Sequence, residues 1–263
     1  MTSPSQLSVT NGGAGESQVT ILRTREDVAQ AVADEFAKIA EESISRSGRF
    51  SVALAGGSTP RDAYLQIAEA ELSGSCRLPW DKIHVFFGDE RPVPPDDAAS
   101  NYRMANESLL SRVPIPGENV HRIRAELEPS AAAQEYEREL QKFFDHGTRG
   151  FDLVLLGMGP DGHTASLFPN TAALSEESRL VVANWVEKLK QSRLTLTLPV
   201  FNRSGQVLFV VVGSDKASVL QQVLTDKEIK YPAQRVRPLS GQLRWIIDED
   251  AARLLPRNLE RAG

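Results

Sequence analysis

The chain has 263 residues, of which 41% are hydrophobic and 25% charged, and its formal net charge is −5 at pH 7. This length allows one large domain or two small ones, with a sizeable core. The mild negative charge, without a dominant basic face, argues against nucleic acid or an anionic membrane as the main partner. The single cysteine, Cys76, has no Cys/His cluster around it, so we expect neither a disulfide nor a metal site.

The first 17 residues, MTSPSQLSVTNGGAGES, are polar and contain neither a basic region nor an apolar run. They predict a disordered tail over 1–17, not a secretory signal, with a single domain over 18–263. The longest apolar runs, FDLVLLGMG and QVLFVVVGS, are much shorter than the ~20 residues of a membrane helix. We therefore expect a cytoplasmic protein that does not bind membranes. The sequence does not reveal its oligomeric state, and a monomer is compatible with it.

Short apolar segments alternate with amphipathic ones along the chain. The pattern predicts strands at 19–23, 50–55, 82–87, near 119–123, and at 151–157, 179–186, 193–199, 206–213 and 243–248. It predicts helices at 25–47, 60–72, 101–113, 129–146, 215–224 and 249–255. Thr24 is expected to cap the first of these helices and Gly48 to end it.

Several predicted strands, such as VALA, VLL and LFVVV, are apolar throughout, which is typical of a parallel sheet covered by helices on both faces. Neither an internal repeat nor a Pro/Gly linker follows the N-terminal segment. The sequence thus predicts an α/β fold, doubly wound and Rossmann-like, with a mainly parallel sheet. Such folds bind ligands at the carboxyl ends of their strands, so candidate sites are expected there.

The segment ALAGGSTPRDAY, after the strand at 50–55, is the first candidate site. Gly56 and Gly57 allow close approach to the backbone, and Ser58 and Thr59 open a helix whose first N–H groups and dipole attract an anion. The segment lacks the dinucleotide fingerprint and the Gly-Lys-Ser/Thr ending of a P-loop. An ordinary strand-to-helix turn with a Ser or Thr cap fits the same residues.

Three charged residues, Asp89, Glu90 and Arg91, follow the next strand, on a loop that several prolines stiffen. A solvated turn is the common outcome for such a cluster. Later, LLGMGPDGHTASLFP places Asp161 and His163 in a glycine-rich loop after the strand at 151–157. An imidazole can serve as a general base near neutral pH, and a carboxylate can orient it, although a lone histidine is more often structural.

Two cations complete the candidate set. Arg193 begins the strand at 193–199, and Lys216 lies in the first turn of the helix at 215–224, where the helix dipole disfavours a cation. A phosphate group would compensate both charges, because lysine binds phosphate as a point charge and arginine as a fork. We therefore predict a phosphate site from Gly56–Thr59, Arg193 and Lys216; ordinary surface charge is the alternative.

The segments LAGGSTPRDAY, FFGDERPVPPDDAASNYRMA and LLGMGPDGHTASLFP together resemble the three motif blocks of the 6-phosphogluconolactonase family. That family shares a superfamily with glucosamine-6-phosphate deaminase. The resemblance extends from about Val19 to Leu255 and includes RLTLTLP and VVGSDKASVL. It implies hydrolysis of 6-phosphoglucono-1,5-lactone to 6-phosphogluconate in the oxidative pentose phosphate pathway, with neither a metal nor an organic cofactor.

The resemblance also implies roles for the candidate residues. His163 is expected to deprotonate the attacking water, and Arg91 to stabilise the oxyanion that develops on the lactone carbonyl. Asp89 and Asp161 are expected either to bind sugar hydroxyls or to orient the water and the imidazole. The residues alone leave these two possibilities open.

Three other functions fit the sequence less well. Deaminases of the superfamily typically carry Asp-Glu-Tyr at Asp89-Glu90-Arg91 and a glutamate at Phe168, which assists their histidine in opening the sugar ring. A sugar-phosphate sensor on this fold would usually carry a DNA-binding segment and lose its base, whereas His163 is present and no helix-turn-helix pattern is visible. A nicotinamide dehydrogenase would need the missing glycine fingerprint.

Overall fold

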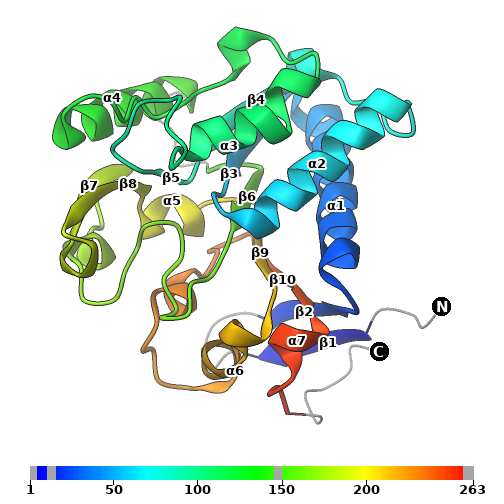
Figure 1. Ribbon diagram of the computed structural model, residues 1–263, viewed down its shortest axis with the longest axis vertical. Helices are drawn as coiled ribbons and strands as arrows, with labels where there is room; N and C mark the ends of the chain where they lie inside the picture. The colour runs from blue at the N-terminus through cyan, green and yellow to red at the C-terminus, as the bar shows by residue number, and fades with distance from the viewer. Residues whose placement is uncertain (1–4, 11–15, 145–149, 257–263) are drawn as a thin grey trace.

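The computed structural model describes residues 5–10, 16–144 and 150–256 (Figure 1). Its centre is a seven-stranded sheet in the order β1-β2-β10-β9-β6-β3-β4, in which every pair except β1–β2 is parallel. The predicted α/β fold with a mainly parallel sheet is confirmed. The strands of this sheet are β1 (Ser5–Thr10), β2 (Glu16–Leu22), β3 (Phe50–Leu54), β4 (Ile83–Phe87), β6 (Leu153–Leu156), β9 (Gln206–Val211) and β10 (Gln242–Asp248).

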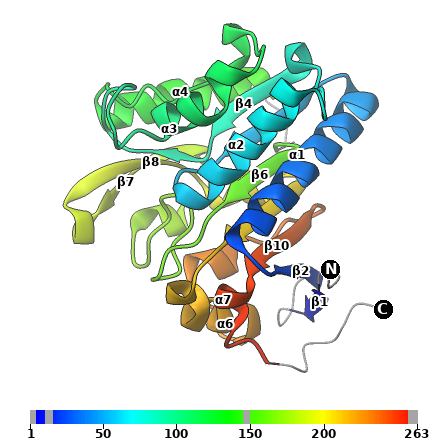
Figure 2. The same ribbon diagram turned by 45° about the vertical axis from the view of Figure 1, so that its right-hand side comes forward.

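Helices α1 (Arg25–Ser47) and α2 (Ser58–Ser73) run side by side across the sheet (Figure 2). As predicted, Thr24 caps α1, in a capping box with Asp27, and Gly48 ends the helix with a left-handed φ of 77°. None of the helices in the described ranges has an apolar stretch long enough to cross a bilayer. The remaining α-helices are α3 (Asn101–Ser108), α4 (Pro129–Phe143), α5 (Leu198–Asn202), α6 (Ala217–Thr225) and α7 (Glu249–Ala252).

A second, three-stranded antiparallel sheet lies beside the first. It has the order β5-β8-β7 and consists of β5 (Asp89–Glu90), β8 (Gln191–Leu196) and β7 (Val181–Val186). Figure 2 shows β7 and β8 on the side of the molecule away from α1. The sequence pattern predicted β7 and β8 as strands but did not separate them from the parallel sheet. It also missed β5, because two residues are too few to show a period.

Three predictions need correction. The disordered tail expected over 1–17 is wrong for residues 5–10 and 16–17, because β1 pairs with β2 there. The pairing uses backbone hydrogen bonds, which a polar composition does not prevent. Residues 1–4 and 11–15 lie outside the described residues. The strand near 119–123 is reduced to a single bridge between Val85 and Val120. Helix α4 ends at Phe143, and residues 145–146 of the predicted helix lie outside the described residues.

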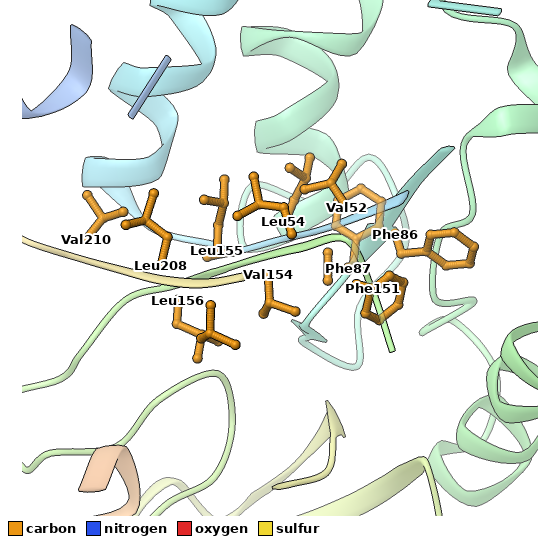
Figure 3. Packing of buried hydrophobic residues seen from close by; sticks show 14 of the residues in the cluster. Val52, Leu54, Phe86, Phe87, Phe151, Val154, Leu155, Leu156, Leu208 and Val210 are labelled. Carbon is orange, nitrogen blue, oxygen red and sulfur yellow. The ribbon is translucent and has the colours of Figure 1, made fainter. Parts of the chain in front are cut away.

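The central strands are buried on both faces. Figure 3 shows side chains of β3, β6 and β9 projecting to both sides of the strands, with the phenylalanines of β4 beside them. Leu54, Leu156 and Leu208 are each 1–2% exposed. Because burying one such side chain stabilises the fold by about 1.5–3 kcal/mol, apolar residues dominate these strands, and the buried hydroxyl of Ser51 in β3 is hydrogen-bonded to Asp152. Polar chemistry is therefore expected in the residues after each strand.

The strand order places a crevice between β3 and β6. The chain continues from β3 to β4 at one edge of the sheet, whereas from β6 it continues to β9 and β10 in the opposite direction. Connections that diverge in this way leave a gap at the carboxyl ends of the two strands, which is where doubly wound folds bind ligands.

Two buried tyrosines secure the strand ends next to this crevice. The Tyr64 hydroxyl accepts a hydrogen bond from the backbone N of Ala55 at 3.0 Å and donates one to its carbonyl at 2.9 Å. The Tyr136 hydroxyl makes the same pair of bonds with Phe87, at 2.8 and 3.2 Å. Burial raises the pKa of both hydroxyls well above the usual value, so both remain able to donate.

Tyr64→Phe and Tyr136→Phe should each lower the free energy of unfolding by about 1–3 kcal/mol, because a buried backbone N–H and C=O lose their partner. Urea denaturation of the purified variants measures the loss. Tyr102→Phe is the matched control, since the Tyr102 hydroxyl makes no hydrogen bond within the described residues. An equal loss in all three variants would contradict this account.

Candidate active site

A cavity of about 500 Å³ lies at the carboxyl ends of β3, β4, β6 and β9, a size typical of small-molecule sites. The segments that follow these strands form its walls, together with Arg25 and Asn101. Most of the site residues predicted from the sequence line it, namely Gly56, Gly57, Ser58, Thr59, Asp89, Arg91, His163 and Lys216. Asp161 and Arg193 do not belong to its lining.

The start of α2 forms one part of the wall. The residue before the helix, Gly57, has a φ of 104° and offers no side chain to cap it. The hydroxyls of Ser58 and Thr59 make no hydrogen bond within the described residues, so the ordinary Ser/Thr cap is not what the structure shows. The uncapped N–H groups and the helix dipole give this wall a positive potential.

Two cations stand beside this helix start. Lys216 Nζ is 2.5 Å from the Asp215 carboxylate, and Arg25 Nε is 2.5 Å from Asp62. The sequence analysis missed Arg25, although it is the first residue of α1 and follows β2, so that its charge opposes the helix dipole just as that of Lys216 does. A search for a cation in the first turn of every predicted helix would have found Arg25.

Arg193 is not among the residues that line the cavity, and its place in the phosphate site stays a prediction. It lies on β8, whose neighbours Leu194 and Thr195 pair with Glu90 and Asp89 of β5. Burial lowers the pKa of Arg193, and the positive charge of Arg91 adds to the effect. The antiparallel sheet thus carries Arg193 toward the Asp89–Arg91 segment, because β8 is not a strand of the parallel sheet.

Glu90 has a structural position despite its place between two cavity residues. Its buried carboxylate accepts hydrogen bonds from the backbone N–H groups of Arg91, Asn101 and Tyr102, at 2.7–2.8 Å, and from the Ser100 hydroxyl at 3.0 Å. Burial raises its pKa, although the backbone hydrogen bonds act in the opposite direction. The side chain fixes the start of α3 against β5.

Asp89 and Arg91 instead face the cavity. Ser166 donates its hydroxyl to Asp89 Oδ2 at 2.6 Å, and the Asn101 amide donates to Oδ1 at 3.1 Å, so both oxygens are held in place. Arg91 donates from Nη1 to the carbonyl of Ala99 at 2.5 Å. The loop after β4 therefore presents to the cavity a fixed carboxylate and, two positions later, a guanidinium.

Asn101, which the sequence analysis quoted but did not assign, connects two walls of the cavity. Besides Asp89 Oδ1, its amide donates to the Asp89 carbonyl at 2.9 Å. A Cβ atom on Gly56 would lie 1.9 Å from Asn101 Oδ1. Gly56 is therefore required by the packing of Asn101, in addition to any approach of a ligand.

His163 is held from both sides. Its Nδ1 is 2.5 Å from Asp161 Oδ1, and its ring stacks on Phe168 with centroids 4.2 Å apart and an interplanar angle of 21°. Burial works to raise the pKa of Asp161, but the hydrogen bonds and charges of His163 and Lys188 outweigh it and lower the pKa to about 2. Asp161 engages Nδ1, and Nε2 has no hydrogen-bond partner within the described ranges.

The loop that carries Asp161 and His163 also depends on a glycine next to the imidazole ring. A Cβ atom on Gly159 would lie 2.1 Å from Cε1 of His163, whereas one on Gly157 would meet nothing within 4 Å. The imidazole thus occupies the space that a side chain at position 159 would fill. Across the described ranges, no group of three or more His, Cys, Asp or Glu side chains is placed to hold a metal ion.

The sequence model of the glucosamine-6-phosphate isomerases and 6-phosphogluconolactonases matches residues 23–245. The chain belongs to this family. The 6-phosphogluconolactonase of Nostoc sp. is 43% identical over 217 residues, which cover 80% of this chain and 87% of that protein. The rat enzyme of the same name is 42% identical over 234 residues, covering 87% and 88%. The structure of 6-phosphogluconolactonase from Thermotoga maritima matches with a TM-score of 0.76 and 35% identity, covering 88% and 98%.

In this member of the isomerase/lactonase family, Gly159→Ala should displace the imidazole while leaving the fold intact, because the new Cβ meets a side chain. The low-field proton resonance of the His163–Asp161 hydrogen bond should disappear from the NMR spectrum. Gly157→Ala is the matched control and should retain the resonance. A Gly159→Ala protein with an unchanged resonance would show that the loop accommodates the methyl group.

Proposed function

We propose that the chain hydrolyses 6-phospho-D-glucono-1,5-lactone to 6-phospho-D-gluconate, a step of the oxidative pentose phosphate pathway, without a cofactor. The observation that carries this proposal is one cavity lined by an uncapped helix start, three cations and a histidine paired with a carboxylate. The relatives from Nostoc sp. and rat, which bear the name 6-phosphogluconolactonase, support it.

The proposed reaction is a direct attack of water on the lactone carbonyl. His163 Nε2 takes a proton from the water as its oxygen bonds to C1, and the carbonyl oxygen becomes an oxyanion. The bond between C1 and the ring oxygen then breaks, and the proton held on His163 passes to that leaving oxygen. That transfer returns the histidine to its neutral form. The new carboxylic acid releases its own proton to solvent.

The neighbouring charges fit this sequence of steps. Asp161 would orient the ring through Nδ1 and stabilise the imidazolium, because its low pKa keeps it ionised throughout. Arg91 would stabilise the oxyanion. Asp89 lines the cavity with both oxygens already fixed, so its proposed role is to bind a sugar hydroxyl through a remaining lone pair.

The phosphate would bind at the start of α2. The backbone N–H groups and the two hydroxyls of Ser58 and Thr59 supply donors, while Lys216 and Arg25 supply positive charge. Arg25 lines the cavity and is added to the predicted phosphate-binding residues, among which Arg193 stays a prediction. With Nε on Asp62, the two terminal nitrogens of Arg25 stay available for a forked contact with phosphate oxygens.

The family also contains isomerases that act on an amino sugar, and two observations favour the lactone. Deaminases of the superfamily typically carry a glutamate at position 168, which assists their histidine in opening the sugar ring, whereas here the uncharged ring of Phe168 stacks on His163. Arg91 stands where the deaminases typically carry tyrosine, and a guanidinium suits an oxyanion. An assay for ammonia release from glucosamine 6-phosphate distinguishes the two activities directly.

His163→Ala should lower kcat by about 10²–10⁴-fold with little change in substrate affinity, as expected for loss of a general base. Activity of the parent enzyme should fall as the pH falls, because protonation of His163 removes its lone pair, whereas Asp161, with a pKa of about 2, stays ionised. This acid limb should be absent from the variant. The lactone is generated with glucose-6-phosphate dehydrogenase, and spontaneous hydrolysis is subtracted.

The matched control is His84→Ala, which removes a histidine near the amino end of β4, away from the cavity. Near-normal kcat in the His163 variant between pH 6 and 8 would refute the mechanism, and Asp89 would become the next base to test.

Lys216→Met and Arg25→Met should each raise KM for the phosphorylated lactone about 10–100-fold and leave kcat nearly unchanged, since each removes a charged contact worth about 1.5–3 kcal/mol. Calorimetry with 6-phosphogluconate should show the same loss of affinity. Arg61→Met is the control, because Arg61 lies in the first turns of α2 but does not line the cavity. Equal turnover of unphosphorylated gluconolactone would contradict the phosphate site.

A further inference from the structure

The second oxygen of the Asp161 carboxylate has a partner outside the catalytic loop. While Oδ1 bonds His163, Oδ2 accepts a hydrogen bond from Lys188 Nζ at 3.1 Å. Lys188 lies in the 3₁₀ turn Glu187–Leu189, which joins β7 to β8 in the second sheet. One carboxylate thus bridges the imidazole, which lies in the loop after β6 of the first sheet, and an ammonium group from the β7–β8 turn of the second sheet.

We infer that Lys188 is a positioning residue for His163, an inference that rests on the proposed function. By binding Oδ2, it limits rotation of the Asp161 carboxylate, so that Oδ1 remains on Nδ1 of the imidazole. Its charge also offsets part of the negative charge that the imidazole experiences. A less negative surrounding favours the neutral ring, which is the form that accepts a proton from water.

The contribution of this ion pair to folding is expected to be small. The Lys188 side chain is 69% exposed, and exposed pairs are typically worth about 0–1 kcal/mol. The Lys188 charge can still affect protonation of the His163 imidazole, because this effect does not require the ion pair to stabilise the fold. The same exposure makes the effect sensitive to salt, since the Debye length is about 10 Å at 0.1 M and about 3 Å at 1 M.

Other charged and titratable groups also surround the His163–Asp161 pair. Tyr231 packs on Gly162 in the same loop. The remaining groups share a cavity or groove wall with His163 or Asp161, and they are Arg25, Asp89, Arg91, Asp215 and Lys216 on one side and Glu176 and Glu187 on the other. None of these hydrogen bonds to Asp161 in the described structure, which distinguishes Lys188 from them.

The test combines direct titration of His163 by NMR with the pH profile of kcat/KM. Lys188→Met should raise the midpoint of the His163 titration by about half a pH unit and move the acid limb of kcat/KM by the same amount. The plateau above the limb should fall about threefold to tenfold, because the carboxylate is less well fixed. Lys188→Arg should restore both, and 1 M NaCl should reduce the shift.

Lys190→Met is the matched control. It removes the same charge from the same hairpin, but Lys190 has no ion pair within the described part of the chain. His163→Gln assigns the resonance among the four histidines. An unchanged His163 midpoint in Lys188→Met, or an equal shift in Lys190→Met, would overturn the inference. A shifted midpoint with an unshifted rate profile would support the role of Lys188 and refute His163 as the base.

Discussion

The burial of the central strands on both faces is the constraint on which the site depends. Strands β3, β6 and β9 are covered on both sides and consist mainly of buried apolar residues. Polar groups of the site lie in the loops after the strands. The strand order makes the connections after β3 and β6 run in opposite directions along the sheet. The cavity follows from that divergence. Tyr64 and Tyr136 then fix the last backbone groups of β3 and β4, which gives the loops a rigid origin.

In and around the cavity, three acidic side chains are each held by donors of their own. Glu90 is held by backbone N–H groups at the start of α3, Asp89 by Ser166 and Asn101, and Asp161 by His163 and Lys188. Three carboxylates close in space would repel one another if they were free. Their oxygens are engaged by different donors, which holds each carboxylate in one orientation.

The second sheet affects the site in two ways, although its strands β7 and β8 lie far from Asp89 in the sequence. Strand β8 pairs with β5 and so holds Asp89 and Glu90 at the end of β4. The turn between β7 and β8 brings Lys188 to Asp161. A small antiparallel sheet thus supports the chemistry of the parallel one from outside, whereas the helix starts supply the positive potential from within.

The sequence by itself determined the α/β class, the strand ends as the place of the site, and eight cavity residues, because glycine turns and charges after apolar strands are local patterns. Local patterns could not show β5, the separate antiparallel sheet or the pairing of Ser5–Thr10, since these depend on strands distant in sequence. For the same reason Arg25, Asn101 and Lys188 were not assigned. The tertiary structure decided which charges meet, because contact between two side chains depends on strand order and not on their separation along the chain.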